Sequence, residues 1–140
     1  MQMKWIAFAL LVSVSTARAQ DIKFSDKEIT AWSAVQEELT ACTAYWQRFK
    51  ACAPENVTKA QSEQADRVIK QFSDLSFEVG NNIGMTLDAM LSRLKMAIED
   101  QNELTEGKCV NFASLTTRYL NRCKAVAEHP DAAFREYMAK

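Results

Sequence analysis

The sequence contains little glycine, proline or histidine, and no block of charge of one sign. Its 140 residues include three glycines, two prolines and one histidine. Glycine and proline are the residues least compatible with helix interiors, so a chain with so few of them can form long helices. Since the chain has no basic block or stripe, nucleic acid and anionic membranes are poor candidates for its partners.

Several motifs that carry chemistry are also missing. There is no Cys-x-x-Cys, which argues against a thiol oxidoreductase and against covalently attached haem. The cysteines lie in two pairs with nine and thirteen residues between partners, whereas zinc sites favour two to four. The segment from Gly80 to Gly84 is followed by Met85 and Thr86 instead of Lys-Ser/Thr, so it is not a phosphate-binding loop. We therefore expect no metal, no cofactor and no enzymatic activity.

Single residues that could take part in catalysis have simpler interpretations. His129 precedes Pro130 at a helix end, where a capping or exposed histidine is more common than a member of a catalytic dyad. Neighbouring carboxylates could form an acid–base pair. They occur at Glu37/Glu38, Asp74/Glu78 and Glu99/Glu103. Side chains of opposite charge also lie four residues apart along this sequence. That is the usual pattern of a helix face in contact with water, so we interpret the carboxylates in the same way.

The first nineteen residues have the pattern of a secretory signal peptide. A basic start ending at Lys4 is followed by the apolar run 5–14 and by Ala17-x-Ala19. The run is shorter than the roughly 20 residues that a membrane span needs, so we predict cleavage after Ala19. Without Lys4 and Arg18, the 17 basic residues become 15 against 18 acidic ones. Residues 20–140 then form one helical domain, and a short signal of this kind favours a periplasmic or secreted location.

The remaining sequence predicts four long helices and a short terminal one. Two capping boxes, at Ser25/Glu28 and Thr58/Gln61, mark the starts of the first two. The first expected helix runs from residue 25 until Pro54 ends it. The next three are expected over 58–79, 85–104 and 109–128, and a short helix follows Pro130. Apolar residues recur three and four apart on each. The predicted inward residues of the first helix are Trp32, Val35, Leu39, Cys42, Trp46, Phe49 and Ala53, and those of the third are Leu87, Met90, Leu91, Leu94, Ala97 and Ile98.

The cysteines indicate how these helices are arranged. Cys42 and Cys52 lie about 15 Å apart along one helix, and Cys109 and Cys123 about 21 Å apart along another. A disulfide needs α-carbons within about 7 Å, so the bonds must join the first helix to the fourth. With a turn at 80–84 the helices alternate in direction, and the pairs become Cys42–Cys123 and Cys52–Cys109.

Two alternatives remain open at this point. If 58–104 were one helix of about 70 Å, Cys109 would emerge too far from Cys52 to pair with it. If instead the first helix ended early, the cysteines could pair locally, as Cys42–Cys52 and Cys109–Cys123. The arrangement in which every cysteine finds a partner across helices is preferred. The predicted fold is all-α, a disulfide-stapled antiparallel four-helix up-down bundle with a short C-terminal helix.

A rigid exported bundle without catalytic motifs is typical of a binding or accessory protein that acts through protein–protein contact, such as an inhibitor or immunity-type factor. The alternative is a bundle that carries a small ligand or metal in its core, although such sites need inward Glu and His. Phe77, Met85 and Met96 fall outside the predicted apolar stripes. Adaptable methionines on a polar face suggest a contact surface for another protein, unless the terminal helix covers them with Phe134, Tyr137 and Met138.

Overall fold

The computed structural model describes residues 23–53 and 57–140. The predicted signal peptide and its cleavage site lie outside these ranges. The described chain is helical and contains no strand. Its elements are α1 (Asp26–Ala51), α2 (Lys59–Asn82), α3 (Leu87–Leu104), the 3-10 turn η1 (Cys109–Asn111), α4 (Phe112–Glu128) and α5 (Pro130–Met138).

Both predicted capping boxes are present at the starts of α1 and α2. The Ser25 hydroxyl accepts from the Glu28 amide, and the Glu28 carboxylate accepts from the Ser25 amide at 2.8 Å. Thr58 and Gln61 form the same pair of bonds at α2. The hydrogen bonds from the backbone and hydroxyl of Ser25 lower the pKa of Glu28. Each box satisfies amides that no helical carbonyl can reach, which fixes where the helix begins.

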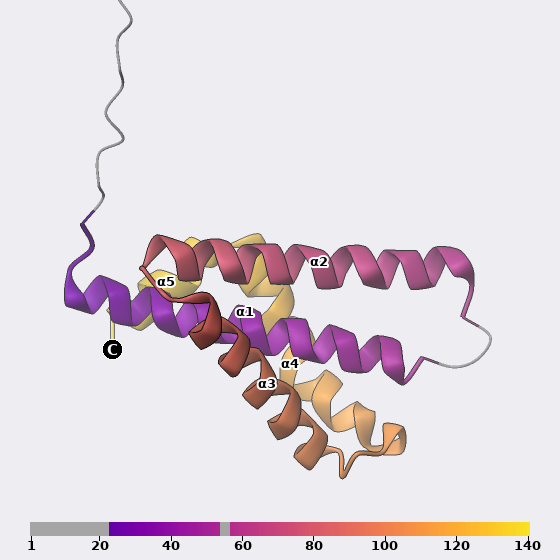
Figure 1. Ribbon diagram of the computed structural model, residues 1–140. Coiled ribbons are helices and arrows are strands. Elements are labelled where there is room, and N and C mark those ends of the chain that lie inside the picture. Colours follow the sequence, from indigo (N-terminus) through magenta and orange to yellow (C-terminus); the bar gives the residue numbers. More distant parts are fainter. Residues whose placement is uncertain (1–22, 54–56) are drawn as a thin grey trace, which may run out of the picture.

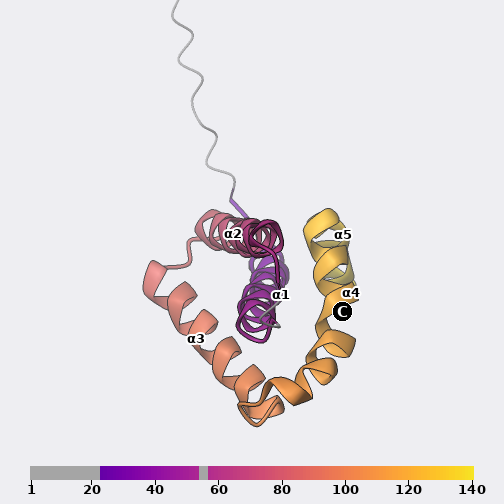
Figure 2. The same ribbon diagram turned by 90° about the vertical axis from the view of Figure 1, so that its right-hand side faces the viewer.

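The helix α1 lies at the centre of the molecule. It contacts α2, α3, α4 and α5, whereas α3 and α4 meet each other only slightly. Figure 1 shows α2 running back alongside α1, and Figure 2, viewed along α1, shows α3 and α4 forming a U around it. The described residues therefore form an antiparallel up-down bundle of four helices, with α3 and α4 oblique to the first two and α5 added at the end.

Two disulfides join α1 and the residue that follows it to α4 and η1. They link Cys42 to Cys123 and Cys52 to Cys109, the pairs that helix geometry favours. The α-carbons are 5.5 and 5.3 Å apart, within the normal range for a disulfide. Because α1 is continuous past Cys42, the local pairing alternative does not occur.

We expect mild reduction to open the two disulfides in order. Cys42 and Cys123 are only 2% and 1% exposed, while Cys52 is half-buried and Cys109 is exposed. A thiolate must reach the sulfur that it attacks, so low dithiothreitol should reduce Cys52–Cys109 first. Alkylation followed by peptide mapping under native conditions measures this order. Simultaneous labelling of all four cysteines would contradict it.

The turn between α2 and α3 begins later than predicted. The helix continues through Gly80 to Asn82, and only Gly84, at φ 76°, takes the left-handed conformation of a turn. Gly80 has a packing role instead, since a β-carbon there would overlap the sulfur of the buried Met90. Glycine lets α3 approach the last turn of α2 closely.

Residues of α1 are buried on several of its faces. Val35, Leu39, Cys42 and Tyr45 join Leu115, Cys123 and Val126 in the core. Gln36, Thr40 and Thr43 are buried on other faces of the same helix. A helix that contacts neighbours on most sides buries residues beyond one apolar stripe, so a single stripe does not describe it.

Candidate functional site

The residues that could have carried catalysis are dispersed over the surface. Among described residues, no three His, Cys, Asp or Glu side chains are close enough to hold a metal ion. His129 is exposed at the junction of α4 and α5. Asp74 and Glu99 each pair with a lysine four residues earlier, on exposed helix faces. Within the same part of the chain, no helix combines the length and apolarity needed to cross a bilayer.

Glu38 is the carboxylate of these pairs that accepts hydrogen bonds from two other helices. Arg122 of α4 donates to both of its oxygens, at 2.8 to 3.1 Å, and the Tyr137 hydroxyl of α5 also donates to it. Burial, and then the bond to Glu38, raise the pKa of Tyr137 to about 12. The hydrogen bonds to Glu38 raise the pKa of Arg122 as well. The cluster joins three helices, which explains why α5 packs against α1.

The terminal helix does not cover the predicted contact residues. Phe134 of α5 stacks on Trp32 of α1 at 4.5 Å between ring centroids. Figure 2 shows α5 and α3 on opposite sides of α1. The alternative in which Phe134, Tyr137 and Met138 shield Met85 and Met96 is therefore wrong. The aromatic pair and Glu38 hold α5 elsewhere.

The three predicted contact residues do not form one surface. Phe77 is half-buried and borders a small depression with Met90 and Leu94 of α3. Met85 is half-buried in the turn before α3. Met96 is 61% exposed. It lies about 160° around the helix from Leu94, at 100° per residue.

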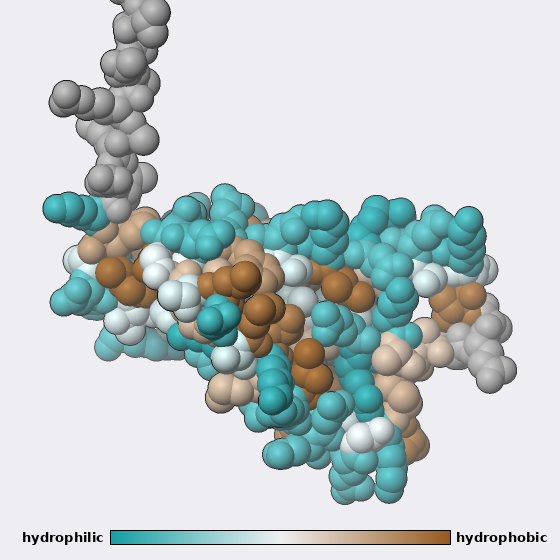
Figure 3. All heavy atoms as spheres, in the orientation of Figure 1, coloured by the Kyte–Doolittle hydropathy of each residue, from teal (hydrophilic) through white to brown (hydrophobic). Residues whose placement is uncertain are grey.

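A different set of residues forms the exposed apolar face of α3. We call Leu87, Leu91, Leu94 and Ile98 the α3 leucine stripe. Leu87 is 58% exposed and Leu91 is 47% exposed, so the prediction that both point inward is wrong. Leu94 and Ile98 are half-buried and border depressions against α1. Figure 3 shows apolar side chains gathered over the first half of α3.

Polar residues explain why the leucines of α3 do not face α1. Arg93 donates to the Ser33 carbonyl at 3.0 Å and to the Gln36 side-chain oxygen at 2.8 Å. The buried Gln101 donates to the Ala41 carbonyl at 2.8 Å. These residues, together with Met90, form the face of α3 that lies on α1. Hydrogen bonds made between helices thus take precedence over the apolar periodicity.

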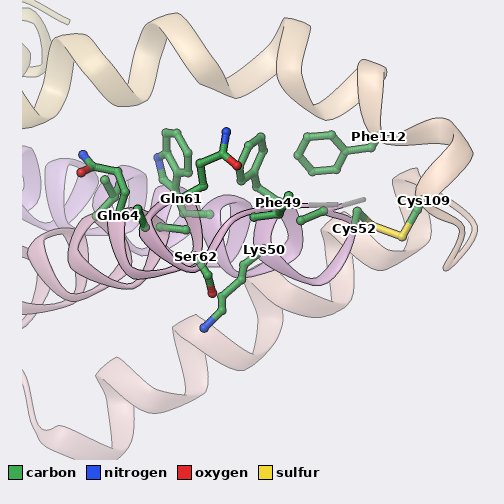
Figure 4. A pocket seen from close by; sticks show the side chains of 14 residues that line it. Phe49, Lys50, Cys52, Gln61, Ser62, Gln64, Cys109 and Phe112 are labelled. Carbon is green, nitrogen blue, oxygen red and sulfur yellow. A yellow bond between two sulfur atoms is a disulfide. The ribbon is translucent and has the colours of Figure 1, made fainter. Parts of the chain in front are cut away.

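A second feature is a cleft at the far end of the bundle, which we call the aromatic cleft. It has a volume of about 920 Å³ and lies beside the Cys52–Cys109 disulfide (Figure 4). The end of α1, the first turns of α2 and the start of α4 form its walls. Its aromatic side chains are Trp46, Phe49 and Phe112.

The aromatic rings in this cleft touch one another. Phe49 lies 5.1 Å from Trp46 and 5.8 Å from Phe112, measured between ring centroids. Phe49 is 41% exposed, so the prediction that it belongs to the core is wrong; it lies in the wall of the cleft. The polar side chains of the lining are Lys50, Gln61, Ser62 and Gln64.

The cleft could not be predicted from the sequence. Gln61 was visible only as half of a capping box, and Val57 and Ala60 carry no signal of their own. The walls come from three segments that are separated by many residues, and only the Cys52–Cys109 bond indicates that the third one lies near the first two. That disulfide was the available clue, since it places Phe112 close to Phe49.

Comparison with protein-family models, with characterised proteins and with solved structures finds no significant match to this chain. Its function must therefore be inferred from its own residues.

Proposed function

We propose that the chain is an exported helical binding protein that acts through protein–protein contact, with the α3 leucine stripe as its contact surface. The observation that carries the proposal is the exposure of Leu87 and Leu91. They lie on a helix whose other face is held on α1 by hydrogen bonds. Two large exposed leucines one turn apart, continuous with half-buried Leu94 and Ile98, leave apolar area in water that a partner would cover.

Export is supported by the signal-like leader and by the cysteines. All four cysteines are in disulfides, and such bonds persist in oxidising compartments such as the periplasm or the extracellular space. The contact surface would thus meet partners outside the cytoplasm.

The spacing of the stripe suggests the kind of partner. Leu87, Leu91, Leu94 and Ile98 follow one another at intervals of four, three and four residues. This is the spacing at which side chains of two packed helices interlock. Lys95 and Glu99 flank the stripe on the exposed side of α3, giving the apolar centre a polar rim. An amphipathic helix of another protein fits this surface.

Site-specific photocrosslinking in the native cells tests the proposal. We expect a benzophenone amino acid at position 91 to give one protein adduct, and the same group at position 96 to give none. Met96 is the matched control because it is at least as exposed as Leu91 but lies on another side of α3. Leu87→Lys should remove the adduct at 91 while changing the free energy of unfolding by less than about 0.5 kcal/mol, as for other exposed positions.

Two other results would count against the proposal. Equal adducts from positions 91 and 96 would show that the stripe is not selective. An adduct at twice the mass of the chain would mean that the occupant is a second copy and not a different protein. Sedimentation of the purified protein distinguishes that case independently.

A further inference from the structure

We propose that the aromatic cleft binds a single-chain amphiphile with a carboxylate head, at a site separate from the α3 leucine stripe. The cleft lies at the end of α1 near Cys52, whereas the stripe begins near the turn between α2 and α3 (Figures 1 and 4). The inference rests on which groups line the cleft and on which of their hydrogen-bonding atoms are already used.

The walls of the cleft suit an apolar chain. Trp46, Phe49 and Phe112 contribute aromatic surface, and the aliphatic residues of the lining add to it. These aliphatic residues are Ala53, Val57, Ala60, Ala65 and Val68. Pockets that hold small ligands have volumes of roughly 300–1,000 Å³ and mostly apolar walls. The 920 Å³ of this cleft lies within that range.

The two glutamines of the lining have their acceptor atoms occupied. The side-chain oxygen of Gln61 accepts from the Thr58 amide at 2.9 Å, as part of the capping box. That of Gln64 accepts from Arg67 at 2.9 Å. Both partners can only donate, so the orientation of each amide is determined by chemistry. Each glutamine therefore offers its NH₂, a hydrogen-bond donor, to a ligand, and the Gln61 oxygen also accepts from the Thr58 hydroxyl at 3.1 Å.

The other polar side chains of the lining also donate. Lys50 is a cation whose ammonium is paired with the exposed Asp66, outside the lining. The indole N–H of Trp46 is buried and bonds to no described residue. Ser62 can donate or accept. Among the described residues, no carboxylate lines the cleft.

A lining of this composition selects the head group of the ligand. Donors and one cation around an apolar cleft stabilise a group that only accepts and carries negative charge. An ammonium head would have to approach Lys50, whose counter-ion Asp66 lies outside the lining. A carboxylate on an aliphatic chain satisfies both the walls and the donors.

The indole N–H resonance of Trp46 reports binding directly. In nitrogen–proton correlation spectra of the purified protein, we expect decanoate to shift this resonance in a saturable way. Trp32 is the internal control, because it packs on Phe134 away from the cleft and its resonance should stay in place. Trp46→Phe assigns the signal. A spectrum in which neither resonance moves, or both move equally, would overturn the proposal.

Two variants test the cleft and the head group. Ala60 is exposed and lines the cleft, so Ala60→Trp should block it and weaken decanoate binding at least about tenfold, the low end of what one lost methylene costs in an apolar pocket. Ala132→Trp, at an exposed position early in α5, is the matched control and should bind normally. Lys50→Met should weaken decanoate by about twofold to fivefold, as expected for an exposed charge, and leave neutral 1-decanol unchanged.

The far-ultraviolet circular dichroism of each variant shows that it is folded before its binding is compared. Unchanged decanoate affinity in Ala60→Trp would place the ligand elsewhere and overturn the site. Equal affinity of the wild-type protein for decanoate and 1-decanol would overturn the carboxylate head.

Discussion

Replacing Cys42 and Cys123 together by alanine should lower the free energy of unfolding by about 4–5 kcal/mol. The disulfide spans 81 residues, but Cys52–Cys109 already closes the inner 57. The remaining loop is about 25 residues, for which the chain-entropy model gives about 3.5 kcal/mol. Both sulfurs lie in the core beside Leu39 and Leu115, so removing them also leaves a small cavity worth roughly another 1 kcal/mol.

The matched control is the pair Cys52→Ala with Cys109→Ala. This bond lies at the edge of the fold, where alanine leaves no buried cavity, so the loss should be smaller by about 1 kcal/mol. Urea denaturation followed by circular dichroism measures both. The reverse order of stabilities would show that the buried bond does not hold α1 and α4 together.

The order and pairing of the helices could be predicted because the cysteines and caps impose hard geometric limits. A disulfide cannot bridge the 10 or 14 residues that separate cysteines on one helix, so the bonds had to join two helices. The hydroxyls of Ser25 and Thr58 begin α1 and α2 where predicted. Such local rules depend on covalent geometry and on unsatisfied amides, and neither depends on distant packing.

The rotation of α3 could not be predicted from its apolar periodicity. The leucines are among the most hydrophobic residues of the helix, yet Leu87 and Leu91 face solvent while Arg93 and Gln101 face α1. A hydropathy scale treats Arg and Gln as surface residues. It cannot show that backbone carbonyls of another helix accept their hydrogen bonds. The same reasoning failed at Phe49, whose neighbours in the cleft come from α2 and α4.

The donor character of the aromatic cleft could not be predicted from the sequence, for a different reason. Its donor character depends on which oxygens of Gln61 and Gln64 are already bonded, and a sequence does not show this. The capping box did show that Gln61 turns its oxygen back to Thr58. Its remaining NH₂ becomes informative only when Trp46 and Phe112 are known to lie nearby.

Arg93 should be the most sensitive polar residue of the fold. Its guanidinium joins α3 to α1 through the Ser33 carbonyl, the Ser33 hydroxyl and the Gln36 side-chain oxygen. Gln36 is 1% exposed, and its nitrogen donates onward to Thr40 and to Ser76 of α2. One side chain thus completes a hydrogen-bond network across three helices, in which each member depends on the others.

We therefore expect Arg93→Met to lower the free energy of unfolding by about 2–4 kcal/mol. Methionine keeps the apolar stem but leaves the buried Gln36 oxygen without its donor, and unsatisfied buried groups cost about 1–3 kcal/mol each. Lys95→Met, two residues along on the exposed side of α3, is the control and should change stability by less than about 0.5 kcal/mol. Hydrogen exchange measured by mass spectrometry should show faster exchange in 87–104 than in α1 when Arg93 is replaced. If both variants lose the same stability, or if α3 keeps its protection, the network does not hold α3 on α1, and the leucine stripe owes its outward position to something else.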